Sequence, residues 1–311
     1  RTLLWGIFRS FFRRNRTLHC THLVMGLSGY FLHRIRGIPY VVWTYGLEVN
    51  SFSKRWVKPI LQNADSVLTI SELTKKHLLT LGVPASRIVK VCPGVNHPPE
   101  IRPLEGRWEK IQDRHSLHHC KTLLTVGSLT KLQRYKGIDM VLQALPTILA
   151  SVPQTRYLVV GSGDDAPYLR ELAQRLGIAV NVHFLGEVSS EELSALYAHC
   201  DIFVMPSREI LQNGRCHYEG FGIVYLEASA FGRPVIGGNG SGAEEAILHD
   251  ETGFLIDPLD IEQLAECALR LLKDAELARR LGEKGRKRAL GEFTWDRAAA
   301  RLIGLLEREV S

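Results

Sequence analysis

The sequence lacks any long apolar run: no stretch reaches the roughly 18 residues that a membrane-spanning helix needs. No secretory signal is expected, because the chain opens Arg-Thr-Leu-Leu-Trp and no small-residue cleavage site follows. Its six cysteines show no Cys-x-x-Cys pair and no metal-ligand spacing: Cys20, Cys92, Cys120, Cys200, Cys216 and Cys267. In a chain of 311 residues this pattern is typical of reduced thiols. We therefore expect a cytoplasmic protein.

Acidic residues are absent from the first part of the chain. None occurs before Glu48, whereas seven arginines do: Arg1, Arg9, Arg13, Arg14, Arg16, Arg34 and Arg36. The net charge is +6 and the pI is about 9.0. This imbalance indicates an anionic partner for the N-terminal part. No nucleic acid is expected among the partners.

Residues 3–14 have the pattern of an amphipathic helix. Apolar residues form one stripe and arginines form another, with Leu4, Phe8 and Phe11 on the first and Arg9, Arg13 and Arg16 on the second. Two interpretations stay open. The aromatic side chains insert into an anionic membrane surface, at the inner membrane face, or they pack under the sheet as an ordinary core helix.

Residues 1–97 predict an α/β domain. Three apolar strands are expected at 41–43, 66–70 and 88–92, with helices at 54–63 and from Ser71 to about Leu81. Ser71 is a good N-cap residue for the second helix. Alternating strands and helices with short loops predict a parallel sheet.

Residues 98–119 show no clear period and predict a linker. The segment and its borders are rich in proline and contain three histidines, His115, His118 and His119. A metal site is the alternative, but no carboxylate or thiol has matching spacing.

Residues 120–290 predict a complete Rossmann-like domain. Strands are expected at 123–126, 157–160, 180–185, 202–206, 234–236 and 253–256, and helices at 138–150, 166–176, 190–199, 243–248, 260–273 and 275–290, besides one that opens at residue 222. Residues 291–311 predict a last helix, expected to pack back toward the N-terminal domain.

The most informative string is Glu219-Gly-Phe-Gly-Ile-Val-Tyr-Leu-Glu227, which follows the apolar run Ile202–Pro206. A strand, a small-residue loop and a helix N-terminus together form an anion site, because unpaired N–H groups point outward. The two carboxylates would repel a diphosphate and are suited to sugar hydroxyls. Phosphate and sugar hydroxyls in one place indicate a nucleotide sugar. The alternative is a solvated helix start whose acidic residues complement the dipole.

The string resembles the signature of the retaining glycosyltransferases of family 4, which have the GT-B fold: two Rossmann-like domains facing a cleft. Seven residues separate Glu219 from Glu227, which is the family spacing. The resemblance implies that Glu219 holds donor-sugar hydroxyls and that Glu227 holds the ribose. It also implies that the turn between them binds the donor, through Gly220, Phe221, Gly222, Ile223 and Val224.

Lys136 lies in Arg134-Tyr-Lys-Gly137, between an expected strand and helix. A lysine there can reach a diphosphate as a point charge, and the matching family lysine binds the donor phosphates. The family usually adds an arginine where this chain has Ser128. Either Arg134 compensates or phosphate binding is weaker. Taken alone, Lys136 would be a surface residue.

Further donor contacts are implied by the resemblance. Gly161 and Gly163 follow a strand, and Leu185 to Val188 follow the next, so that these loops would lie beside the nucleotide and its base. A plain turn is the alternative for the two glycines. Tyr45 stands where the family often has a histidine that contacts the donor sugar. A phenol can also donate a hydrogen bond, but a role that needs imidazole is lost.

The segment 208–218 is polar and precedes Glu219. It is expected to be either a lid over the donor or an ordinary surface loop.

The N-terminal domain is expected to be incomplete. Family members usually begin with a strand and a glycine-rich loop, and no such segment is found before residue 38. The resemblance therefore covers about residues 19–311, and the chain is expected to lack some tens of residues.

Together these patterns predict transfer of a hexose, with retention, from a nucleotide sugar to a lipid-linked or saccharide acceptor. GDP-mannose is favoured as the donor and UDP-sugars come next. No metal or cofactor is expected, because no Asp-x-Asp motif occurs and Asp164-Asp165 starts a helix. The alternatives are a sugar-nucleotide epimerase, a phosphorylase, or a binding protein without transferase activity, the last suggested by Ser128, Tyr45 and the short N-terminal domain.

Overall fold

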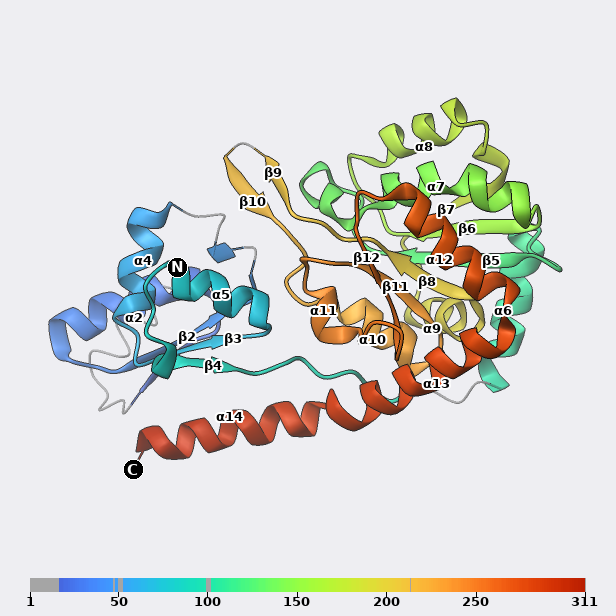
Figure 1. Cartoon of the computed structure of the whole chain (residues 1–311). Coiled ribbons are helices and arrows are strands. Elements are labelled where there is room, and N and C mark those ends of the chain that lie inside the picture. Colours follow the sequence, from blue (N-terminus) through green and yellow to red (C-terminus); the bar gives the residue numbers. More distant parts are fainter. Residues whose placement is uncertain (1–16, 47, 50–52, 99–101, 213, 311) are drawn as a thin grey trace.

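The computed structural model describes residues 17–46, 48–49, 53–98, 102–212 and 214–310. These residues form two α/β domains that lie side by side (Figure 1), and each has a parallel sheet at its centre. The amphipathic helix predicted for residues 3–14 lies outside the described residues. Within the described part of the chain, no helix is both long and apolar enough to cross a bilayer.

The N-terminal domain is built on a four-stranded parallel sheet in the order β1-β2-β3-β4. Its strands are β1 (Leu18–Cys20), β2 (Tyr40–Thr44), β3 (Ser66–Thr69) and β4 (Ile88–Lys90). They alternate with α2 (Leu23–Arg36), α4 (Lys54–Gln62), α5 (Glu72–Thr80) and the short 3₁₀ turn η1 (Ala85–Arg87). The three predicted strands are confirmed, and Ser71 caps α5 by accepting a hydrogen bond from the N–H of Thr74.

Strand β1 and helix α2 were not predicted from the sequence. The strand is only three residues long, so it carries no alternating pattern. Helix α2 contains Gly26 and Gly29, which lower helix propensity. Both glycines are needed for packing: a Cβ on Gly26 would lie 2.7 Å from the side chain of Ile60, and one on Gly29 would lie 2.6 Å from the ring of Tyr40. Close packing of the helix on the sheet therefore outweighs its weak propensity.

The segment predicted as a linker without periodic structure contains helix α6 (Arg102–His115). Leu104, Trp108 and Ile111 repeat at helical spacing, and they pack into the core of the C-terminal domain beside α9. Pro103 lies in the first turn, where its missing N–H costs nothing. Among the described residues there is no cluster of histidine, cysteine or acidic residues that could hold a metal ion.

The C-terminal domain has a six-stranded parallel sheet in the order β12-β11-β8-β5-β6-β7. Its strands, β5 (Lys121–Val126), β6 (Thr155–Val160), β7 (Val182–Gly186), β8 (Ile202–Met205), β11 (Val235–Gly238) and β12 (Gly253–Ile256), confirm all six predicted positions to within two residues. The helices are α7 (Ile138–Ser151), α8 (Ala166–Arg175), α9 (Ser190–His199), α10 (Ile223–Ala230), α11 (Ala243–Ala246), α12 (Ile261–Lys273) and α13 (Ala275–Glu292), with 3₁₀ turns η2 (Lys131–Lys136) and η3 (Ala179–Asn181).

The strand order of this sheet reverses between β5 and β8. From β5 the chain moves outward through β6 and β7, then returns to β8 on the other side and continues through β11 and β12. The loops that follow β5 and β8 therefore diverge at their carboxyl ends. In open α/β sheets this topological switch point is where ligands bind. The loop after β5 carries Lys136, and the loop after β8 leads to Glu219.

The last helix, α14 (Trp295–Val310), crosses back from the C-terminal domain and runs along the N-terminal domain (Figure 1). Ala298, Leu302 and Leu305 pack against a small buried cluster formed by Val41, Leu68 and Val91. The helix covers the face of the N-terminal sheet opposite α2, α4 and α5. The N–H of Val95 donates to the carbonyl of Phe293 at 2.8 Å. At this point the segment that leads into the C-terminal domain lies beside the segment that leads back from it.

The segment 208–218, expected as a lid or a loop, folds into an antiparallel hairpin of β9 (Ile210–Gln212) and β10 (Arg215–His217). The hairpin projects from the C-terminal domain toward α5 (Figure 1). At its base the hydroxyl of Tyr218 lies 2.8 Å from Nδ1 of His77. The segment therefore contributes to the contact between the domains.

Candidate functional site

A cavity of about 620 Å³ lies between the two domains at the switch point. The C-terminal domain contributes Tyr135, Lys136, Glu219, Gly220, Phe221, Gly222, Ile223 and Val224, and the N-terminal domain contributes His22, Tyr45, Glu48 and Ile70. The cavity thus brings together residues that are far apart in the sequence. Eight of its wall residues come from the loop after β5, the loop after β8 and the first turn of α10.

Lys136 and Glu219 form an ion pair in this cavity. The Nζ of Lys136 lies 2.9 Å from Oε2 of Glu219, and the two side chains are 12% and 13% exposed. A shielded pair of this kind is held more firmly than a surface pair, because water screens it less. An anion that enters the cavity would compete with Glu219 for the ammonium group.

The glycine turn opens α10 beside this ion pair. Gly222 takes a left-handed conformation, with φ of 81°, and caps the helix without a side-chain hydrogen bond. The first N–H groups of α10 are therefore open to the cavity that Ile223 and Val224 line. A Cβ on Gly220 would lie 2.4 Å from the carbonyl oxygen of Tyr45. Gly220 thus lets the two domains approach each other closely, a role that the sequence did not indicate.

Glu227 lies further along α10 and does not line the cavity that contains Glu219. Its Oε2 accepts a hydrogen bond of 2.8 Å from the hydroxyl of Tyr197. Burial, and secondly the Glu227 carboxylate, raise the pKa of Tyr197 well above its usual value. The phenol therefore stays protonated and fixes the orientation of the carboxylate.

Arg134 is not brought to the ion pair. Its guanidinium forms a two-pronged contact with the buried carboxylate of Asp165, with Nε at 2.7 Å from Oδ2, and lies over the ring of Tyr168 at 4.3 Å. Ser128 and Arg134 line a separate, narrow space together. In this structure Lys136 is accordingly the cation at the cavity, and Arg134 has a structural partner of its own.

Gly161 and Gly163 stand at the carboxyl end of β6, where the loops after β5 and β6 pack closely. A Cβ on Gly161 would lie 1.9 Å from the carbonyl oxygen of Gly127. Leu185 and Val188 are half-buried against the core. These four residues lie at the same edge of the sheet as Lys136, but they do not line the 620 Å³ cavity.

Tyr45 forms part of the N-terminal wall of the cavity. Its hydroxyl donates to the carbonyl of Thr21 at 3.1 Å, and its ring, 42% exposed, stacks on Trp43 and His22. Burial, followed by the charge of Glu48, raises the pKa of Tyr45. The phenol is thus a neutral group that is already engaged with the backbone.

Sequence reasoning missed two polar residues of this wall, His22 and Glu48. Glu48 is 7% exposed and accepts a hydrogen bond from the backbone N–H of Tyr45. His22 caps α2: its Nδ1 accepts from the N–H of Val24 at 3.2 Å, so a neutral ring carries its proton on Nε2. His22 follows the strand that the sequence did not reveal, whereas Glu48 could have been found from its place after β2.

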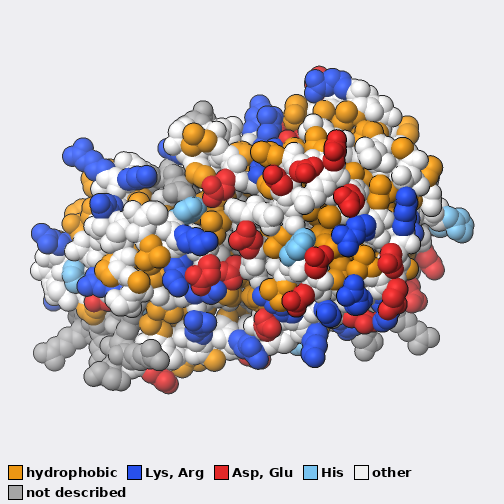
Figure 2. Space-filling model, in the orientation of Figure 1, with side chains coloured by type: hydrophobic (Ala, Val, Ile, Leu, Met, Phe, Trp, Pro, Cys, Tyr) orange, Lys and Arg blue, Asp and Glu red, His pale blue; other side chains and the backbone are white. Residues whose placement is uncertain are grey.

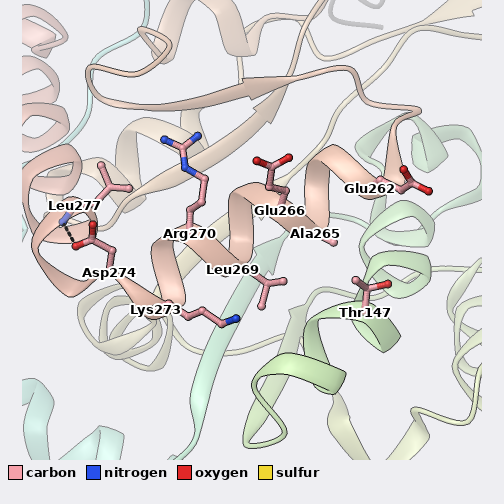
Figure 3. Close-up of a pocket in the computed structure, with 9 residues that line it drawn as sticks. All are labelled: Thr147, Glu262, Ala265, Glu266, Leu269, Arg270, Lys273, Asp274 and Leu277. Carbon is pink, nitrogen blue, oxygen red and sulfur yellow. Dashed lines mark hydrogen bonds between the residues drawn. The ribbon is translucent and has the colours of Figure 1, made fainter.

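A second cavity of about 660 Å³ lies on the outside of the C-terminal domain along α12 (Figure 3). Its charged side chains include Glu262, Glu266, Arg270 and Lys273, which project from α12 in different directions. It is not at the carboxyl edge of the sheet, and the N-terminal domain contributes nothing to it. The arrangement provides no convergent set of groups for a ligand.

Comparison with known proteins places the chain in a family. Residues 109–288 match the family model of glycosyl transferases group 1, and residues 3–97 match that of Glycosyltransferase Family 4. A GDP-mannose-dependent alpha-(1-6)-phosphatidylinositol monomannoside mannosyltransferase of Mycobacterium tuberculosis is 33% identical over 85% of this chain and 68% of its own length. The protein of the same name from Mycolicibacterium smegmatis is 32% identical over 91% of this chain and 73% of its own.

Solved structures agree in fold. Sucrose-phosphate synthase from Thermosynechococcus elongatus superposes with a TM-score of 0.77 and 26% identity, covering 99% of this chain and 78% of that one. Anabaena HepE in complex with UDP and glucose gives a TM-score of 0.83 at 19% identity, and the match covers 98% of this chain and 81% of that one. The latter likeness concerns the fold alone. The chain therefore belongs to the group 1 and family 4 glycosyltransferases and is a glycosyltransferase of the GT-B fold.

Proposed function

We propose that this glycosyltransferase moves mannose from GDP-mannose, with retention of anomeric configuration, to a lipid-linked acceptor. The observation that carries the proposal is the Lys136–Glu219 ion pair beside the open N-terminus of α10. A cation and free N–H groups suit a diphosphate, and a carboxylate next to them suits sugar hydroxyls. The names of the mycobacterial relatives support mannose and GDP, and the wording of the sequence motif supports retention.

The chemistry follows from charge. As the bond between the anomeric carbon and the diphosphate oxygen breaks, negative charge grows on the leaving diphosphate. Lys136 and the first N–H groups of α10 stabilise that charge, so they act where the transition state differs from the ground state. Donor binding transfers Lys136 from Glu219 to the phosphates, which frees the carboxylate to accept hydrogen bonds from the sugar. No metal or other cofactor is needed in this scheme.

Glu227 and the loops after β6 and β7 complete the proposed donor site. Glu227, held by Tyr197, accepts hydrogen bonds from the ribose. The backbone around Leu185 and Val188 contacts the base, and the loop at Gly161 and Gly163 lies alongside. Ser128 replaces an arginine, so the diphosphate is held by one lysine rather than by two cations.

An anionic membrane surface is part of the proposal. Helices α2 and α4 contain no acidic residue, and their basic residues include Arg34, Arg36, Lys54, Arg55 and Lys58. Large apolar side chains on the same helices are exposed: Phe31 by 48%, Ile35 by 67% and Trp56 by 61%. Figure 2 shows mainly Lys and Arg among the charged side chains at the outer end of the N-terminal domain. Each basic residue near an anionic leaflet contributes about 1 kcal/mol.

The decisive experiment measures nucleotide binding and product formation together. A thermal-shift screen of GDP, UDP and ADP is expected to favour GDP, with about 2.7 kcal/mol of stabilisation at a hundredfold excess over its Kd. Incubation with GDP-mannose and an alkyl α-mannoside should give an α-linked disaccharide, identified by proton NMR. A β-linked product would overturn retention. GDP binding without transfer would leave a binding protein, and conversion of the donor without acceptor would indicate an epimerase.

Membrane attachment has its own test. Sedimentation with anionic and with neutral vesicles, at low and at high salt, should give binding only to anionic vesicles at low salt. Binding that ignores lipid charge would overturn this part of the proposal and leave the transferase chemistry standing.

A further inference from the structure

A third cavity, apolar and about 530 Å³ in volume, adjoins the 620 Å³ cavity between the domains, which is called the donor cavity below. It lies between the carboxyl end of the N-terminal sheet and helix α14, with Trp43, Trp295, Ala299 and Leu302 among its wall residues. Tyr45, Ile70 and Ile223 line both cavities. The two spaces therefore share one wall, and a ligand can extend from one into the other.

The apolar cavity offers almost nothing to a polar ligand. Its described wall has no charged side chain, and its polar side-chain groups are the Tyr45 hydroxyl, which donates to the Thr21 carbonyl, the Cys92 thiol and the indole N–H groups of Trp43 and Trp295. Large apolar side chains in the wall nevertheless stay exposed: Tyr45 by 42%, Ile223 by 39% and Trp295 by 53%. Apolar surface left open beside a reaction centre is typical of a binding site for apolar groups.

We propose that this cavity binds the hydrocarbon chain of a glycolipid acceptor while the acceptor's sugar lies in the donor cavity. The inference rests on the proposed function and extends it to acceptor recognition. An occupant of both cavities must be amphiphilic, because one cavity contains Lys136, Glu219 and Glu48 and the other contains no charge. Helix α14 supplies one side of the apolar cavity, which gives this terminal helix a role in acceptor selection.

The first test uses acceptor chain length. Methyl, hexyl and octyl α-mannosides, below their micelle concentrations, are compared as acceptors with GDP-mannose. Burial of each methylene is worth about a fourfold gain, so kcat/KM should rise steeply from methyl to hexyl and level off once the cavity is filled. Equal kcat/KM values for the three acceptors would overturn the proposal without affecting the proposed function.

A matched pair of variants on α14 locates the effect. Ala299 lines the cavity, and its neighbour Ala300 is exposed and does not. Ala299→Phe should lower kcat/KM for octyl mannoside at least tenfold and leave methyl mannoside and GDP binding unchanged. Ala300→Phe should change none of these values. Equal behaviour of the two variants would contradict the assignment.

Cys92 gives a readout that does not depend on turnover. Its half-buried thiol lines the cavity, so octyl mannoside should slow its alkylation by N-ethylmaleimide, followed by peptide mass spectrometry. Methyl mannoside should not. The same measurement tests a different occupant, the chain's own residues 1–16. If Cys92 is unreactive without ligand and becomes reactive when those residues are deleted, the cavity belongs to the chain's own N-terminal segment and the proposal fails.

Discussion

The two domains contribute different chemistry to the cavity that they share. The C-terminal domain supplies fixed charges, Lys136 and Glu219, and an open helix end. The N-terminal domain supplies a wall of rings around one buried carboxylate, with His22, Tyr45 and Glu48 held by backbone contacts. The groups that the proposed function assigns to the diphosphate therefore belong to one domain. The other domain shapes the space into which an acceptor must fit.

Few polar contacts join the domains. The Nζ of Lys90, in the N-terminal domain, lies 3.2 Å from Oε2 of Glu245 in the C-terminal domain. The same Nζ lies 3.0 Å from Oε1 of Glu72, which belongs to its own domain. The backbone N–H of Glu72 also donates to Glu245, and His77 contacts both Tyr218 and Glu209 of the hairpin segment. Because residues of both domains line the cavity, these contacts help to hold its two walls together. Five predictions test the division between the domains.

The largest effect is expected for Lys136→Ala. The change removes the cation proposed to hold the diphosphate and leaves Glu219 without its partner. Affinity for GDP should fall ten- to hundredfold, as expected for a charged hydrogen-bonding group, while affinity for guanosine stays constant. Calorimetry with both ligands measures this. Lys131→Ala, an exposed residue of the same 3₁₀ turn, is the control. Equal losses for GDP and guanosine would remove Lys136 from the phosphates.

Glu219→Gln should separate binding from turnover. Turnover should fall ten- to hundredfold because a charged acceptor for the sugar hydroxyls is lost. GDP should bind as well as before or more tightly, because Lys136 no longer has a carboxylate partner. Steady-state kinetics measures the turnover, and calorimetry on the same preparation measures the affinity for GDP. A variant that loses GDP affinity while retaining turnover would reverse the two roles.

The contact between the domains is tested by Glu245→Ala. The side chain is 14% exposed and meets Lys90 across the boundary. Removing this contact should cost about 1 kcal/mol of interaction energy between the domains, which corresponds to a roughly fivefold fall in kcat/KM. The activity of the variant should also depend less on salt than that of the parent. Lys75→Ala, whose partner Glu72 lies on the same helix, should have little effect. A salt response identical to the parent would argue against this link.

A smaller effect is expected from pH, through a histidine of the C-terminal domain. Burial, with His115 and Arg156 nearby, lowers the pKa of His183. The unfolded chain therefore binds the proton more readily, and stability falls as the pH drops below about 6.5 toward the folded pKa. Urea unfolding of His183→Phe should show a weaker loss of stability between pH 7 and pH 5. His97→Phe, at an exposed position, should lose as much stability as the parent over the same pH range.

The smallest effect is expected for Tyr45→Phe. The hydroxyl is already bound to the carbonyl of Thr21, so its removal should change kcat/KM by no more than about threefold, or some 0.5 kcal/mol. The ring and its stacking remain. A loss of a hundredfold would mean that the phenol contacts the donor directly, and the N-terminal wall would then share in donor recognition.

The C-terminal domain was largely predictable because its elements are long and locally consistent. Its strands are continuous apolar runs that the parallel sheet buries on both faces, and the helices between them have a clear period. In the N-terminal domain β1 and α2 escaped prediction, because their residues are chosen for close packing rather than for propensity. Helix α6 escaped because its few apolar residues stand among prolines and charges.

The motif, its glycine turn and the alternation that makes a parallel sheet could be read from the sequence, because these features depend on neighbours along the chain. The tertiary structure was needed to show that Lys136 pairs with Glu219, that Arg134 is held by Asp165, and that His22 and Glu48 form the opposite wall. It also decided that α14 leaves an apolar cavity beside the site. These contacts depend on strand order and on how one domain seats against the other, and no local pattern encodes such long-range packing.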